Sequence, residues 1–92
     1  MHYLLDTVTI IRHFTDTGKI PEKTKNILAG TENHFLISVI SLMEIMYLSE
    51  KLKINISLTE TLDKIVSSSL YTTMNLNLEI LKVAETLSFN EL

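Results

Sequence analysis

The chain of 92 residues contains no cysteine and no tryptophan, and only one proline and two glycines. Without cysteine it can form neither a disulfide nor a thiolate metal site. It has no apolar run near the ~20 residues needed to cross a bilayer. Its N-terminus also lacks a basic region before an apolar one, so it does not resemble a signal peptide. We therefore expect a soluble, cytoplasmic protein that does not contact a membrane.

Basic residues are also few. Lysine and arginine number 8 against 11 aspartates and glutamates, which gives a formal charge of -3. A protein whose affinity depends on neutralising phosphates alone needs clustered basic residues, so this class is disfavoured. Metal-assisted chemistry on nucleic acid is not excluded, because an acidic site can bind a cation before the nucleic acid binds.

The composition is that of a folded chain, since 46% of the residues are apolar and 21% are charged. We expect one domain over residues 1–92. Strand-like apolar segments at 1–5, 35–40 and 71–74 alternate with helical patterns at 7–14, 21–29 and 58–68. This alternation predicts an α/β fold with a short parallel sheet. Two further helices are predicted, one after the second strand with Leu42, Ile45, Met46 and Leu48, and a last one with Leu78, Leu81, Ala84 and Leu87.

Three large side chains, Met43, Met46 and Tyr47, lie in the helix predicted after the second strand. Packing in the core is the first interpretation, because methionine adapts to irregular gaps. The alternative is a surface for a partner protein, since an exposed apolar helix face marks such sites.

Two acidic residues follow the first two strand-like segments. Asp6 comes directly after residues 3–5, and Glu44 follows the apolar segment 35–43. Ligands of open α/β sheets bind beyond the carboxyl ends of the strands, so we expect both carboxylates at one crevice. Hard oxygen ligands of this kind suit Mg²⁺ or Mn²⁺.

Each acid also has a structural interpretation. Asp6 can cap the helix that begins at Thr7. Ser41 and Glu44 fit the S-x-x-E capping box, in which the glutamate bonds to the serine amide. Both alternatives stay open at this point.

Residues 3–7 (YLLDT) and 37–45 (ISVISLMEI) resemble the opening half of PIN-domain proteins, especially the ribonuclease toxins of VapBC-type toxin–antitoxin modules. The resemblance implies a three-layer αβα fold and a Mg²⁺- or Mn²⁺-dependent endoribonuclease. It implies that Asp6 and Glu44 are catalytic metal ligands. Thr7 and Ser41 would then support these ligands or cap the adjacent helices. The implied partners are an RNA substrate and an antitoxin protein.

The chain departs from that family in two ways. Val8 stands where the family commonly has asparagine, and the chain ends before the segment that carries the third and fourth acids. We therefore expect a truncated, N-terminal portion of a PIN-like domain with weak or absent activity. The missing strands would leave apolar surface uncovered, which favours a homo-oligomer.

Two rival hypotheses remain. The first is a non-catalytic module that self-associates or binds an antitoxin-like peptide. The second is an unrelated small α/β domain in which both acids are only caps, and it predicts that the two carboxylates do not converge.

Overall fold

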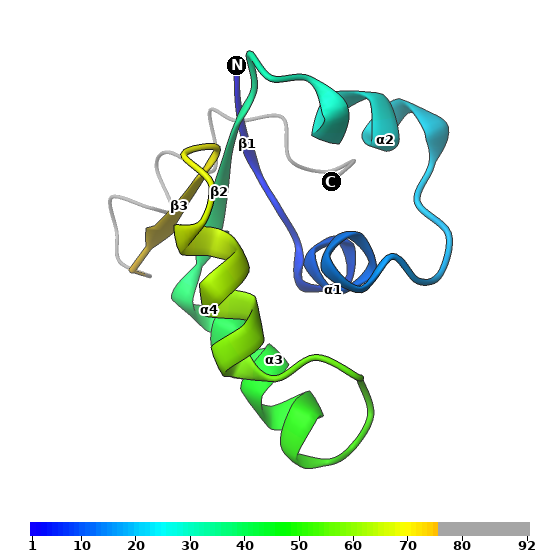
Figure 1. Cartoon of the computed structure of the whole chain (residues 1–92), viewed down its shortest axis with the longest axis vertical. Helices are drawn as coiled ribbons and strands as arrows, with labels where there is room; N and C mark the ends of the chain where they lie inside the picture. The colour runs from blue at the N-terminus through cyan, green and yellow to red at the C-terminus, as the bar shows by residue number, and fades with distance from the viewer. Residues whose placement is uncertain (76–92) are drawn as a thin grey trace.

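The computed structural model describes residues 1–75 and shows three short strands connected by pairs of helices (Figure 1). All three strands are parallel, and their order in the sheet is β1-β2-β3. The predicted α/β fold with a short parallel sheet is confirmed. The elements are β1 (His2–Leu4), α1 (Thr7–Thr15), α2 (Glu22–Ala29), β2 (His34–Ser38), α3 (Val39–Glu50), α4 (Leu58–Val66) and β3 (Tyr71–Met74). The helix predicted around Leu78 to Leu87 lies outside the described residues.

Strand β2 is the centre of the sheet. Phe35 and Ile37 point into the core and are fully buried, and Leu36, between them, is only 8% exposed. A central parallel strand is covered on both faces, so its sequence reads as a continuous apolar run. The register pairs Leu36 with Leu4 on one side and with Thr72 on the other. The second predicted strand is therefore present, and it is the most buried of the three described strands.

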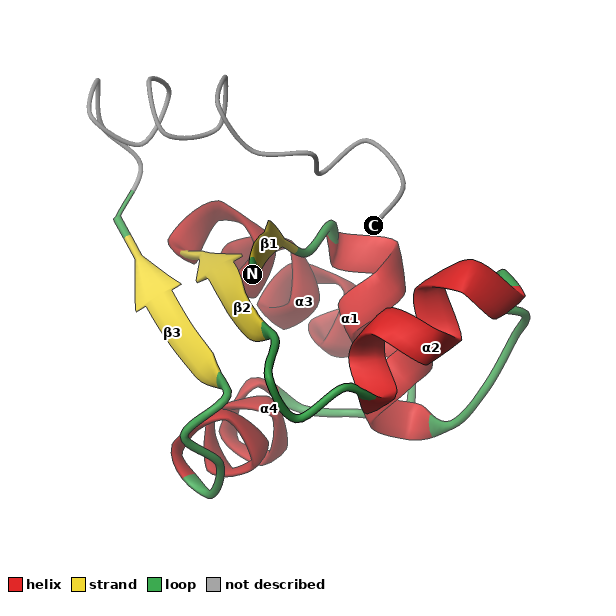
Figure 2. Cartoon of the chain, turned by 90° about the horizontal axis from the view of Figure 1, so that it is seen from above, coloured by secondary structure: helices red, strands yellow, loops and turns green. Residues whose placement is uncertain are grey.

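One hydrophobic core joins the sheet to all four described helices. Figure 2 shows α1 and α2 together beyond the β1 edge, and α4 on the side of β3. Burial of these side chains supplies the main driving force for folding, at roughly 25 cal/mol for each Å² removed from water. The core consists of Leu5, Ile10, Leu28, Phe35, Ile37, Leu42, Ile45 and Ile65.

The second strand ends earlier than predicted. The sequence suggested residues 35–40, but β2 ends at Ser38 and α3 begins at Val39. Ser38 is the helix cap, because its hydroxyl accepts a hydrogen bond from the Ile40 amide at 3.1 Å. The apolar, β-branched pair Val39 and Ile40 extends the strand pattern in the sequence, and the cap overrides that preference.

The prediction that three large side chains of α3 pack in the core is wrong. Met43 and Tyr47 are 54% and 59% exposed, and Met46 is also exposed. The buried residues of this helix are Ser41, Leu42 and Ile45. Since α3 carries apolar side chains around most of its circumference, only part of that surface can face the core.

A partly buried polar contact joins α1 to β3. The Nε2 atom of His13 lies 3.1 Å from the Tyr71 hydroxyl, and the ring of Phe14 packs edge-on against Tyr71. Burial lowers the pKa of His13 below its ordinary value of 6.5, the charge of Lys64 lowers it further, and Asp16 opposes both effects. The folded state therefore binds a proton at His13 less readily than the unfolded chain does.

None of the helices within residues 1–75 is both long enough and apolar enough to span a membrane.

We predict that acidification weakens the fold through His13. Between the lowered pKa and 6.5 the unfolded chain binds more protons, so the free energy of unfolding falls as the pH falls. Urea denaturation from pH 7 to about 5.5 should show this fall, and His13→Gln should make it smaller. The exposed His2→Gln is the control and should keep the wild-type slope. Identical slopes for wild type and His13→Gln would contradict the assignment.

Candidate functional site

Asp6 lies directly beyond β1. The preceding residue, Leu5, is 1% exposed, and its amide donates to the Leu36 carbonyl at 3.0 Å. Asp6 is the N-cap of α1, and its Oδ1 accepts from the Thr9 amide at 2.7 Å. The capping interpretation of Asp6 is therefore confirmed. The same cap holds an exposed carboxylate at the carboxyl end of the strand, so it leaves a ligand role available.

Glu44 is not part of a capping box. Because α3 begins at Val39, Ser41 lies inside the helix and is buried, and Glu44 lies in the second turn. The capping interpretation of Ser41 and Glu44 is wrong, since Ser38 occupies the cap position instead. The same S-x-x-E pattern does form a reciprocal capping box at α4, where Ser57 and Glu60 bond to each other's backbone amides.

Thr7 bridges the two segments. Its Oγ1 lies 3.1 Å from Glu44 Oε1 and 3.0 Å from Ser41 Oγ. A threonine hydroxyl has a single hydrogen, and a bond to a carboxylate is the stronger of the two. We therefore assign that hydrogen chiefly to Glu44, with Ser41 Oγ as the second acceptor within reach of the Thr7 hydroxyl. This network fixes the first turn of α1 against the second turn of α3.

The two acids line one pocket. A recess of about 250 Å³ lies beyond the carboxyl ends of β1 and β2, and both Asp6 and Glu44 line it. The second rival hypothesis, an unrelated domain in which both acids are only caps and do not converge, is therefore contradicted. The lining residues are Leu4, Leu5, Asp6, Thr7, Ser38, Ser41 and Glu44.

The donor set of this pocket suits a hard divalent cation. Asp6 and Glu44 each use one carboxylate oxygen in the hydrogen bonds above, and each has a second oxygen that these bonds do not use. Mg²⁺ is commonly held by one or two carboxylates and keeps several waters. Within residues 1–75, however, no three His, Cys, Asp or Glu side chains cluster as metal ligands. The described part of the chain thus offers two protein ligands.

Val8 adds no polar group beside Asp6. Its side chain is 52% exposed and follows Thr7 on the first turn of α1. Support for the acidic pair comes instead from Thr7 and Ser41. The contact between Thr7 and Glu44 joins residues 37 positions apart, so no local sequence signal could have identified it.

We predict that two substitutions distinguish the contribution of the Asp6 helix cap to stability from that of its charge. Asp6→Ala removes the acceptor for the Thr9 amide and should lower the free energy of unfolding by about 1 kcal/mol. Asp6→Asn keeps a good N-cap and should change it by less than about 0.5 kcal/mol. Urea denaturation measures both. An asparagine variant as unstable as the alanine variant would show that the charge itself holds the helix.

Comparison with known proteins gives no match to any family model, to any curated protein or to any solved structure. The geometry of this pocket and the two sequence motifs are therefore the grounds for assigning a function.

Proposed function

We propose that this chain is a cytoplasmic, PIN-like endoribonuclease of the toxin–antitoxin type, in which Asp6 and Glu44 hold Mg²⁺ or Mn²⁺. The observation that supports the proposal most is the convergence of both carboxylates at the carboxyl ends of two adjacent parallel strands. These are the two residues that the PIN-domain resemblance assigns as metal ligands.

The residues of the pocket would have different roles in binding the ion. A bound Mg²⁺ or Mn²⁺ supplies a Lewis acid for the phosphodiester and lowers the pKa of a water that can attack phosphorus. Asp6 would hold the ion with the carboxylate oxygen that the Thr9 amide does not use. Thr7 would keep Glu44 in place by donating to its other oxygen, and Ser41 would hold Thr7.

Activity of the chain alone is expected to be weak. Rate enhancement depends on placing the reacting groups accurately, and two carboxylates restrain an ion less than a fuller set of ligands does. The described residues supply no third ligand at this pocket. RNA as substrate and an antitoxin as partner follow from the resemblance and are part of the proposal.

We predict that Mn²⁺ binds this chain saturably and weakly, as measured by calorimetry. Asp6→Asn and Glu44→Gln should each abolish detectable binding, because each removes one of two charged ligands. Asp6→Asn retains the helix cap, so its loss of binding would not reflect unfolding. The control is Glu50→Gln, which removes the same charge at the far end of α3. Absence of binding in the wild type, or an equal loss in Glu50→Gln, would contradict the metal site.

The surface of α3 favours a second candidate function. In this alternative the chain is a non-catalytic module that self-associates. Exposed apolar side chains lie around this helix and on the adjacent α4, and they line two shallow, mostly apolar depressions of about 480 and 210 Å³. Contiguous apolar surface of this kind marks protein–protein contacts. The side chains concerned are Ile40, Met43, Met46, Tyr47 and Leu62.

If this second function holds, Met43→Glu should shift the chain from dimer to monomer in sedimentation experiments over a concentration series. A charge placed in an apolar interface must be desolvated, which opposes association. Val66→Glu is the control, because Val66 is 80% exposed on α4 and lies outside both depressions. A wild-type monomer at all concentrations would exclude self-association and leave binding of an antitoxin-like protein as the use of this surface.

A further inference from the structure

A second cavity lies at the opposite end of α1 from Asp6. It has a volume of about 390 Å³, within the usual range for small-molecule sites, and lies between the end of α1, the loop after it, and α2. Asp6 caps the first turn of α1, and Asp16 follows its last residue. The two cavities have no lining residue in common.

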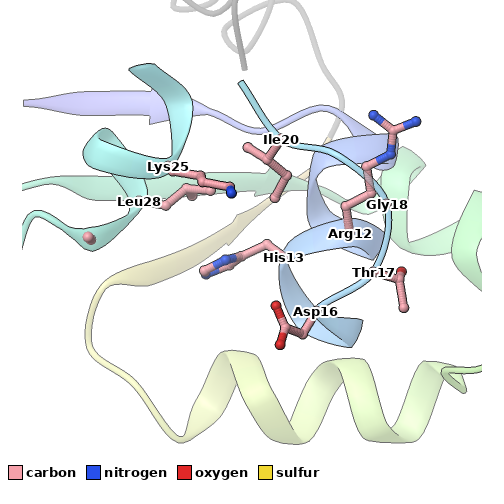
Figure 3. A pocket seen from close by; sticks show the side chains of 9 residues that line it. Arg12, His13, Asp16, Thr17, Gly18, Ile20, Lys25 and Leu28 are labelled. Atoms are coloured by element: carbon pink, nitrogen blue, oxygen red, sulfur yellow. The ribbon is translucent and has the colours of Figure 1, made fainter. Parts of the chain in front are cut away.

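The cavity is lined by both polar and apolar side chains. Figure 3 shows Lys25 from α2 and His13 from α1 reaching toward the same space, with Ile20 and Leu28 along its wall and Asp16 next to His13. The Nε2 atom of His13 is already bonded to the Tyr71 hydroxyl. The guanidinium of Arg12 is turned away, and it donates to the Lys19 carbonyl at 2.9 Å.

The loop that closes the cavity is held in one conformation. Gly18 has a φ of +67°, which glycine adopts without steric cost. A Cβ atom at this position would also lie 2.9 Å from Arg12 Nε, so the loop closely surrounds the arginine. The Thr17 amide donates to the Arg12 carbonyl at 3.1 Å. These contacts define the backbone conformation of the loop that lines the cavity.

Two side chains of opposite charge, Lys25 and Asp16, line this cavity. An ammonium group only donates, and a carboxylate only accepts. A ligand that presents an oxygen acceptor to Lys25 and a hydrogen to Asp16 would satisfy both groups.

We propose that this cavity binds a singly protonated phosphate monoester: Lys25 donates to a phosphate oxygen, Asp16 accepts the P–OH hydrogen, and Ile20 and Leu28 contact the organic group. The second pKa of such a monoester is about 6, so the protonated form is abundant near that pH. The size of the cavity and its apolar wall favour a monoester over inorganic phosphate. Sulfate resembles phosphate in shape but carries no proton, and it would place negative oxygen against the Asp16 carboxylate.

The test is a titration at pH 6, followed by NMR, with adenosine 5′-monophosphate, inorganic phosphate and sulfate. A chelator is present throughout, so the outcome is independent of the divalent-metal site. We expect adenosine 5′-monophosphate to bind most tightly, inorganic phosphate next, and sulfate about tenfold more weakly than phosphate, since a charged hydrogen bond is lost. Tighter binding of inorganic phosphate than of the nucleotide would overturn the monoester assignment.

Three variants complete the test. Lys25→Gln should weaken nucleotide binding about tenfold, whereas Lys23→Gln, on the same helix but outside the cavity, should have no effect. Asp16→Asn should bring sulfate to the affinity of phosphate, and asparagine tolerates the left-handed backbone at this position, where φ is 54°. Equal affinity of the wild type for sulfate and phosphate, or nucleotide binding unchanged in Lys25→Gln, would overturn the proposal.

Discussion

The parallel pairing of β1 with β2 is the constraint on which the rest of the structure depends. It places Leu4 opposite Leu36 and continues through the hydrogen bond from the Leu5 amide to the Leu36 carbonyl. Because the strands are parallel, their carboxyl ends lie at the same edge of the sheet. A helix begins almost immediately after each strand, at Thr7 and at Val39. Two helix N-termini and the acids near them are thus brought to one place by backbone pairing.

Local capping then determines how the acids are presented. Asp6 is both the cap of α1 and a wall of the pocket, so one side chain serves helix stability and the acidic site together. On α3 the cap is Ser38, which frees Glu44 to bond across to Thr7. A start of α3 three residues later would have satisfied the predicted box at Ser41 and turned Glu44 back onto its own helix. The position of one helix start therefore decides whether the two carboxylates meet.

Much of the fold could be predicted from the sequence because its patterns are strong and local. The strand-like segments at 1–5 and 35–40, the proline before α2 and the capping box at Ser57 each indicate an element that the structure contains. The end of β2 could not be predicted, since Val39 and Ile40 favour a strand as much as a buried helix. The exposure of Met43 and Tyr47 was also missed, because α3 is apolar on several sides and periodicity does not reveal which side the core covers. At the site, parallel topology was enough to bring Asp6 and Glu44 together, whereas the Thr7 bridge depends on tertiary packing.

We propose that Asp6, directly beyond β1, and Glu44, in the second turn of α3, form one divalent-metal site. Paramagnetic broadening by substoichiometric Mn²⁺ tests it most directly, because only nuclei close to the bound ion lose their NMR signals. The account predicts that amide signals of the Asp6–Thr7 turn and of the Ser41–Glu44 turn broaden together, at the same Mn²⁺ concentration. Broadening of one turn without the other, or of neither, would contradict a shared site.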